Sequence, residues 1–387
     1  MKRITKKQRD RDILNALDHR TPSKTVTTTP FIPISRDIYS PINDFIEKEM
    51  KNGLNYTLTK SRQKGIIVYL PKHMDFNQNH DVTLQHLTVI SKLVELIKKN
   101  KGRVLPRGSY NLGSVNFDNL ESISTPAALV LTAEISNWDD TLRNKLTPKV
   151  KRWNDDIYSQ LSDLGFFDLF KNKPCIKPCS NEHPCSDKRL VRYKKGECGV
   201  KGKTKELKTD LMTIIGDSVN KWTFLHTGLG EAITNVSHHA YPDDYDARSS
   251  KKQWFLTGSY NEQTKQLKVA FYDQGIGIPN TLPGSKVKEK VLEYLSKLNI
   301  DHIERKKDEQ LLKAAVEINR TSTGINDRGK GLQDLLEFIK QLKSGRLSIL
   351  SGSGHYTYTM KNGNESSMTT ALKRPILGTL IIWSVNL

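Results

Sequence analysis

The chain has 387 residues, of which 27% are charged and 36% hydrophobic, a composition typical of a folded protein rather than a disordered one. No apolar run approaches the ~20 residues of a membrane-spanning helix, and no apolar segment follows the basic start Met1–Lys7 as it would in a secretory signal. We therefore expect a cytoplasmic protein without membrane contact, long enough for two domains with separate cores.

The net charge of +19 at pH 7 predicts an anionic partner, such as a nucleic acid, an acidic protein or a nucleotide. Basic residues concentrate at Lys2–Arg11 and Lys188–Lys208, and no helix-turn-helix, zinc-finger or RNA-binding motif accompanies them. A solvated basic surface with a basic tail explains the same charge, so nucleic acid stays one alternative among several.

Residues 1–60 are predicted to form a basic tail and linker. Thr and Pro dominate Thr21–Pro33, which is typical of a connecting segment. A short helix is expected at Pro41–Lys51, before the first domain.

Residues 61–165 are predicted to form a small α/β domain. The β-branched run Gly65–Pro71 is typical of a buried strand, and apolar residues recur at helical spacing over Val82–Lys99. A second strand is expected at Val115–Phe117. A second helix then begins at Thr125, because the following proline fits a first turn, where its missing N–H has no intrahelical partner. This β–α–β–α alternation favours an α/β fold.

Residues 166–203 are predicted to be a connector, and 204–387 a second α/β domain. The expected elements of the second domain, in chain order, are a long helix, a two-stranded hairpin, two charged helices, another helix and three strands: Thr204–Tyr241, Gln253–Tyr260, Gln266–Asp273, Lys286–Lys297, Asp308–Ile318, Gly331–Leu342, Arg346–Leu350, His355–Met360 and Thr379–Val385. Both the helix and the strand periodicities are clear in this half.

The connector holds every cysteine of the chain: Cys175, Cys179, Cys185 and Cys198, with His183 among them. In a cytosolic protein such clustering favours a metal over a disulfide, and tetrahedral zinc takes four nitrogen or sulfur donors. The spacing lacks the paired C-x₂-C units of common zinc sites. A zinc site and an insertion without metal therefore both remain open.

The first of three motifs places Glu231 and Asn235 four residues apart on the predicted long helix, so that both side chains leave the same face. An amide oxygen such as that of Asn235 can ligate Mg²⁺, which prefers oxygen ligands and phosphates. Glu231 can then act as a general base on water. The alternative is that Glu231 is a surface residue and Asn235 a helix cap.

The second motif begins at Asp273, which ends the strand Val269–Tyr272. Its carboxylate is an acceptor suited to the exocyclic amine of adenine. Gly275 and Gly277 then allow the backbone to approach a flat ring, because they carry no Cβ. An ordinary Asp-Gly turn is the alternative.

The third motif precedes the helix Gly331–Leu342 and consists of Arg328, Gly329, Lys330 and Gly331. Backbone N–H groups at a helix start favour phosphate binding, and the two side chains add positive charge. Gly378 and Thr379 open the last predicted strand.

In this order, the motifs resemble those of the GHKL superfamily, whose members share the histidine-kinase-like (Bergerat) ATP-binding fold. The segment from Glu231 through His239 to Tyr241 is most similar to the anti-sigma-factor serine kinases. The resemblance implies a mixed sheet covered by helices on one face over 204–387, with ATP and Mg²⁺ as cofactors. It also implies that Thr379 helps to hold adenine through water. His238 and His239 are interpreted as helix residues, and a position of either one, His239 above all, near the phosphates is the alternative.

Two further resemblances concern the regions around this domain. Residues 280–327 correspond to the lid that closes over ATP in the family, and their length and charge predict a mobile cover that nucleotide orders. The segment Val115–Trp138 resembles a STAS domain, in which a serine at the matching turn is phosphorylated. Ser124 or Thr125 would be that hydroxyl here, and the alternative is that Thr125 caps the helix.

Three functions follow as hypotheses. The first is a Mg-dependent ATPase or a nucleotide-controlled switch in bacterial signalling or defence, with Glu231 as the base. The second is a serine/threonine protein kinase of the anti-sigma-factor type. The third is a module that binds ATP without turnover and regulates a neighbour, so a protein partner or substrate is expected in each case.

Overall fold

The computed structural model describes residues 32–33, 36–59, 64–99, 103–104, 109–171, 173, 187–197, 202–216, 219–242, 252–282, 288–298, 301, 303–321 and 331–387. Most of the predicted tail and linker, the four cysteines, and Arg328, Gly329 and Lys330 lie outside these residues. Across the described residues, every helix is too short or too polar to span a membrane.

The first half of the chain contains a three-stranded sheet and three main helices; two of the strands and the helices were expected, whereas β2 lies in residues predicted to be linker. In the sheet, β3 pairs antiparallel with β2 and parallel with β6. The bounds of these elements are α2 (Arg36–Lys51), β2 (Tyr56–Leu58), β3 (Lys64–Tyr69), α3 (His80–Lys99), β6 (Tyr110–Asn116) and α4 (Thr125–Ser136). Helix α2 begins earlier than predicted, so Pro41 lies inside it.

Short elements fill in around this frame. They are β1 (Ile32–Pro33), β4 (His73–Met74), β5 (Arg103–Val104), β7 (Ser122–Ile123), α5 (Asp140–Lys145), η1 (Val150–Arg152), α6 (Asp155–Leu164) and η2 (Phe166–Leu169). Phe117 stacks on Trp153 with ring centroids 4.4 Å apart, and Phe166 meets the edge of Phe117 at 5.8 Å. This aromatic cluster packs the α6–η2 segment against the end of β6.

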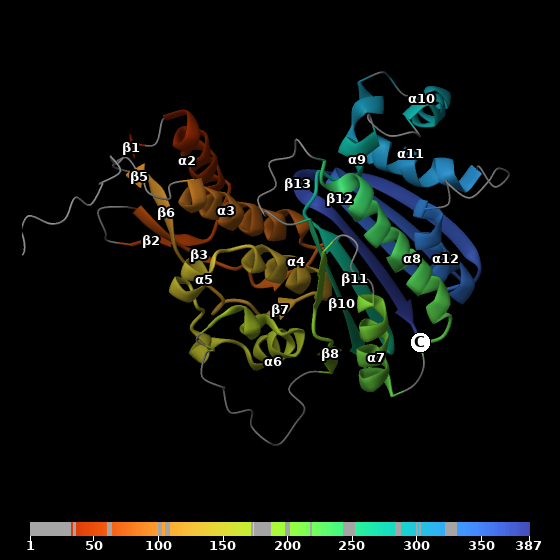
Figure 1. Ribbon diagram of the computed structural model, residues 1–387, viewed down its shortest axis with the longest axis horizontal. Coiled ribbons are helices and arrows are strands. Elements are labelled where there is room, and N and C mark those ends of the chain that lie inside the picture. The colour runs from red at the N-terminus through yellow and green to blue at the C-terminus, as the bar shows by residue number, and fades with distance from the viewer. Residues whose placement is uncertain are drawn as a thin grey trace, which may run out of the picture.

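The second half is built on a larger sheet with the strand order β12-β13-β11-β10-β8, and β9 pairs with the same edge of β10 as β8 (Figure 1). Its strands are β8 (Lys188–Leu190), β9 (Lys194–Glu197), β10 (Gln253–Asn261), β11 (Gln266–Asp273), β12 (Gly345–Lys361) and β13 (Asn364–Asn386). Every pair is antiparallel, so the expectation of a mixed sheet is wrong. Two of these strands come from residues expected to be a connector.

The helices of this half are α7 (Lys203–Ile215), α8 (Trp222–Asn235), the π-helix η3 (Val236–Ala240), α9 (Ile278–Thr281), α10 (Lys288–Lys297), η5 (Glu304–Lys306), α11 (Asp308–Thr321) and α12 (Gly331–Leu342). The single long helix expected over 204–241 is interrupted at Gly216, whose φ of 79° is left-handed. A left-handed glycine is a common helix end. Helix α7 therefore stops there, and α8 starts as a separate element.

Both faces of the larger sheet are covered, because its strands alternate apolar side chains between two cores. Val269 and Phe271 of β11 face the core that contains α7, α8, α11 and α12, whereas Ala270 and Tyr272 face the core of the first half. Figure 1 shows α4 on the side of the sheet opposite α8. The helices α7, α8, α11 and α12 therefore share one face of this sheet, in line with the prediction for 204–387, and the first half of the chain packs on the second face.

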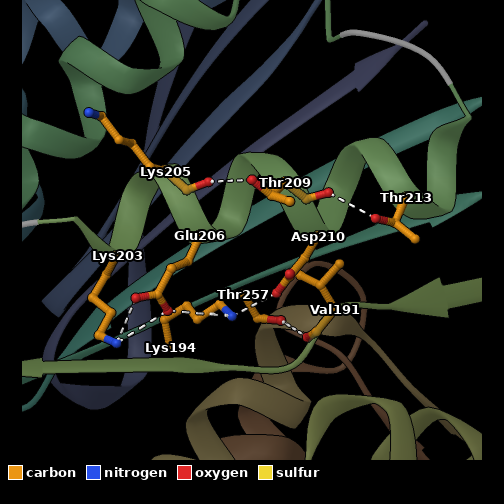
Figure 2. Close-up of polar contacts among 9 residues, drawn as sticks. All are labelled: Val191, Lys194, Lys203, Lys205, Glu206, Thr209, Asp210, Thr213 and Thr257. Carbon is orange, nitrogen blue, oxygen red and sulfur yellow. Dashed lines mark hydrogen bonds and ion pairs between the residues drawn. The ribbon is translucent and has the colours of Figure 1, made fainter.

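A small polar network fixes α7 to the edge of the sheet (Figure 2). Lys194 of β9 pairs with Asp210 at 2.6 Å and with Glu206 at 3.7 Å, while its side chain is only 13% exposed. Thr257 of β10 donates to the carbonyl oxygen of Val191 at 2.7 Å. Because the Lys194 side chain is largely buried, we expect this ion pair to stabilise the fold more than a solvent-exposed pair does.

An ion pair joins the two halves of the chain. Arg374 of β13 donates to the Glu49 carboxylate of α2 at 2.6 Å, and Gln85 of α3 donates to the same carboxylate at 2.9 Å. The Glu49 side chain is 3% exposed. A buried carboxylate without these donors would be costly, so the pair ties α2 and α3 to β13.

We expect Glu49→Ala to lower the free energy of unfolding by about 2–3 kcal/mol, because it leaves the Arg374 guanidinium unpaired; the partial exposure of Arg374 moderates the cost. Urea denaturation measures the change. The adjacent Lys373, which is 85% exposed, gives the control Lys373→Ala, expected within about 0.5 kcal/mol of wild type. Equal losses in both variants would refute the assignment.

Candidate active site

Asp273 lies at the end of β11, between Trp254 of β10 and Thr379 of β13. Its side chain is nearly inaccessible to solvent, at 4% exposure. The N–H of Gly275 donates to its Oδ1 at 2.9 Å, so the chain turns back over the carboxylate directly after the strand. The sequence prediction that Asp273 ends this strand is confirmed.

Burial raises the pKa of Asp273 to about 7, and backbone N–H groups of Gly275 and Thr379 lower it only in part. The carboxyl group is therefore close to half-ionised at neutral pH. A carboxyl group in this state gains from any ligand that brings a hydrogen-bond donor to it.

Two glycines allow the backbone to close around this carboxylate. A Cβ on Gly275 would come within 2.3 Å of the carbonyl oxygen of Ala240, and one on Gly378 within 2.0 Å of the carbonyl oxygen of Asp273. Gly378 also has a left-handed φ of 73°. No other residue type fits either position without displacing backbone.

The loop after Asp273 contacts the end of η3. The N–H of Ile276 donates to the carbonyl oxygen of Ala240 at 2.9 Å. The N–H of Gln274 donates to the hydroxyl of Tyr241 at 3.1 Å, and that hydroxyl donates to the carbonyl oxygen of Gln253 at 2.7 Å. The structure thus joins the second motif to the helix that carries the first.

Ser351 of β12 belongs to the same site, and sequence reasoning missed it. Its hydroxyl lies 3.0 Å from that of Thr379 and accepts from the N–H of Ile278 at 2.8 Å. The residue is fully buried. A serine beside Gly352 in a strand carries no sequence signal, because only the pairing of β12 with β13 brings it to Thr379.

Glu231 and Asn235 share one face of α8, as predicted. Burial and the neighbouring Asp334 raise the pKa of Glu231, while the Asn235 side chain and His238 oppose the rise. Because Asn235 favours the ionised carboxylate, it acts on Glu231 through its amide N–H, which leaves the amide oxygen for a ligand.

The first turn of α12 lies beside this pair. Gly228 of α8 permits the close crossing, since a Cβ there would meet the carbonyl oxygen of Asp334 at 2.9 Å. Gly331 begins α12, so this member of the third motif starts a helix that packs on α8. His239 lies in η3 with much of its side chain exposed, and the partial burial of its ring, followed by the neighbouring His238, lowers its pKa.

The described part of the proposed lid is not a loose cover. Leu312 and Val316 of α11 are buried in the same core as α8 and α12. Asp308 accepts from the N–H of Ser353 at 2.7 Å, and Glu317 accepts from the hydroxyl of Tyr356 at 3.0 Å. Helix α11 is thus docked on β12, and the ordering of 280–327 by nucleotide stays a prediction.

The proposed phosphorylation turn is also closed. The Ser124 side chain accepts from the N–H of Ala127 at 3.4 Å and so caps α4, which corrects the expectation that Thr125 does so. Thr125 is 1% exposed, and its hydroxyl lies 2.6 Å from that of Ser259 in β10. This hydroxyl ties α4 to the larger sheet.

Helix α4 also reaches the site at its other end. Asn137, the C-cap residue of α4, donates to the side-chain oxygen of Gln274, the neighbour of Asp273. The first half of the chain therefore contacts the loop that covers the buried carboxylate. A contact between residues so far apart in sequence leaves no local pattern.

Compared with known proteins, the chain matches no family model and no curated protein. Within the described residues, no group of three or more His, Cys, Asp or Glu side chains is placed to hold a metal ion. The four cysteines lie outside those residues, so the zinc prediction stays a prediction.

We expect the stability of the protein to depend on Asp273 between pH 5 and pH 8. The unfolded carboxyl ionises near pH 3.8, whereas the folded one keeps its proton to about pH 7. Stability contributed by the protonated form is therefore lost as pH rises, by about 3 kcal/mol over this interval. Urea denaturation at both pH values should show this fall in wild type but not in Asp273→Asn. Equal slopes would contradict the assignment.

Gly275→Ala should destabilise the protein by about 2 kcal/mol, because its Cβ meets a backbone oxygen that cannot move aside. Gly230→Ala in α8 is the matched control. Nothing lies within 4 Å of a Cβ there, so alanine should stabilise the helix by about 0.5–1 kcal/mol. Thermal unfolding distinguishes the two, and a neutral Gly275→Ala would show that the loop is not closely packed.

Proposed function

We propose that the chain binds ATP around Asp273 and hydrolyses it with Glu231 as general base. The observation that carries this proposal is the buried Asp273 carboxyl group, with a pKa near 7, enclosed by glycines at the edge of the sheet. The resemblance to the GHKL superfamily supports the same assignment.

Adenine recognition follows from the chemistry of the carboxyl group. The exocyclic amine of adenine donates a hydrogen bond, which the ionised Asp273 carboxylate accepts. Gly275 and Gly277 let the loop pack closely on Ala240 and Ser351 beside the carboxylate, and the paired hydroxyls of Ser351 and Thr379 offer polar atoms there. A purine without an amino group would leave the buried carboxylate unpaired, which disfavours it.

The catalytic role falls to Glu231. Burial and the Asp334 charge raise its pKa, which brings it closer to the value of an effective base at neutral pH. Glu231 accepts the proton of the attacking water, and Asn235 holds the carboxylate through its amide N–H. The freed amide oxygen of Asn235 is a suitable ligand for Mg²⁺. That ion would supply charge neutralisation at the phosphates.

Transfer of phosphate to the chain's own Thr125 is disfavoured, because that hydroxyl is buried and bonded to Ser259. A kinase that acts on a separate protein remains the alternative. An assay with γ-labelled ATP separates the two, because an ATPase releases labelled free phosphate whereas a kinase transfers the label to its protein partner.

We expect Glu231→Gln to retain ATP binding and to lower the hydrolysis rate by about 10²-fold, since only proton acceptance is lost. Asp273→Asn should weaken binding at least about tenfold, because the asparagine amide has one acceptor oxygen and a donor nitrogen in place of the two acceptor oxygens of the carboxylate. Calorimetry measures binding, and release of labelled phosphate measures turnover.

Matched controls come from acidic residues away from the site. Glu293→Gln on α10 and Asp156→Asn on α6 change the same chemical groups at exposed positions and should leave both quantities within about twofold of wild type. If Asp273→Asn binds ATP as tightly as Asp156→Asn does, the proposal fails.

A further inference from the structure

A cavity of about 360 Å³ lies between the start of α4 and the ends of β11, β12 and β13. Lys268 lines it and precedes Asp273 by five residues on β11, a separation of roughly 17 Å along the strand. Asn386 lines it too, so it lies at the sheet end where the chain terminates, marked C in Figure 1. The cavity is thus remote from the Asp273 carboxylate.

The charged side chains of the cavity are unbalanced. Lys268, Arg346 and Lys361 line it, against a single acidic residue, Asp75. Asp75 Oδ1 already accepts the backbone N–H groups of Asn77 and Gln78, at 2.7 and 2.9 Å. The net positive charge is therefore not cancelled within the lining.

These cations also lack carboxylate partners. In the part of the chain that the structure describes, none of Lys268, Arg346 and Lys361 forms an ion pair. Among the same residues, Arg346 donates one hydrogen bond, to Thr357 at 3.3 Å, and its Nε is buried without a partner. A guanidinium has five N–H donors, so most of its capacity is unused.

Two neighbouring features add to the positive potential. Ser124 and Pro126 place the N-terminal end of α4 against the cavity, where the helix dipole favours an anion. Burial and then the charge of Lys268 lower the pKa of Lys188 in β8 to about 8, and Asp75 partly opposes this fall, so Lys188 lies near the cavity. The start of α4 and Lys188 thus add positive potential to that of the lining cations.

The remaining lining indicates what kind of anion fits. Ser348, which is buried, and Thr359 both line the cavity, so hydroxyl donors accompany the cations. Phe76, Met360 and Ile382 supply an apolar wall. The volume is at the lower end of the range for small-molecule sites, about 300–1,000 Å³.

We propose that this cavity is a second ligand site, which binds a small phosphorylated organic molecule. Lys268, Arg346 and Lys361 take the phosphate, and the wall around Phe76 takes the organic part. Arg346 is the main determinant, because its planar fork can bind two phosphate oxygens at once. The site is independent of the proposed ATP pocket.

Calorimetry with inorganic pyrophosphate tests the phosphate half of the site. Wild type should bind it, and Arg346→Gln and Lys361→Gln should each bind it at least tenfold more weakly. Lys361 is exposed, so its substitution keeps the test valid even if Arg346→Gln unfolds. Lys373→Gln removes the same charge from β13 outside the cavity and should bind as wild type does.

A double variant, Arg328→Gln with Lys330→Gln, separates this site from the proposed ATP pocket, because it removes the basic side chains of the third motif. Pyrophosphate binding that survives in this variant and falls in Arg346→Gln supports the cavity. Loss in the double variant with full binding in Arg346→Gln overturns it. So does an equal loss in Lys373→Gln, or an absence of binding to wild type.

Discussion

Burial of an ionisable carboxyl group at the end of a central strand is costly, and the surroundings of Asp273 are arranged around that cost. Two backbone N–H groups partly offset the loss of water, and the pKa still rises to about 7. The backbone encloses the group so tightly that Gly275 and Gly378 have no room for a Cβ. A donor-bearing ligand is the natural complement to a carboxylate kept in this condition.

The larger sheet connects this site to the rest of the molecule because both of its faces are covered. Helix α4 contacts it twice, through Thr125 with Ser259 and through Asn137 with Gln274. The pair of Glu49 with Arg374 fixes α2 to β13. The first half of the chain is therefore part of the packing that holds the site, not a separate body on a linker.

Local patterns were sufficient for much of the fold. Helix α12 and the hairpin β10–β11 were found almost to the residue, because their apolar periodicity is strong and their ends carry glycine or polar turns. The carboxylate of Asp273 and the shared face of Glu231 and Asn235 followed from the same reasoning. Each of these depends on residues close in sequence.

What failed depends on partners that are distant in sequence. Strand β9 has the sequence Lys-Lys-Gly-Glu, which has no strand signature and is held in the sheet by β10. Helix α11 carries many charges, and the burial of its Leu312 and Val316 against α8, α12 and β12 was not foreseen. Ser351 and Asn137 reach the site only through tertiary contacts. The burial of the second face of the larger sheet could not be predicted from residues 204–387, because the residues that pack on it belong to the first half of the chain.

The titration of Asp273 itself tests this account most directly. Carbon-13 NMR of the labelled carboxyl group, with and without an ATP analogue, reports its ionisation independently of global stability. The account predicts a pKa near 7 in the free protein and a fall of at least one unit when the nucleotide binds, because a bound amine favours the ionised form. An ordinary pKa near 4, or a value that the nucleotide leaves unchanged, would contradict it.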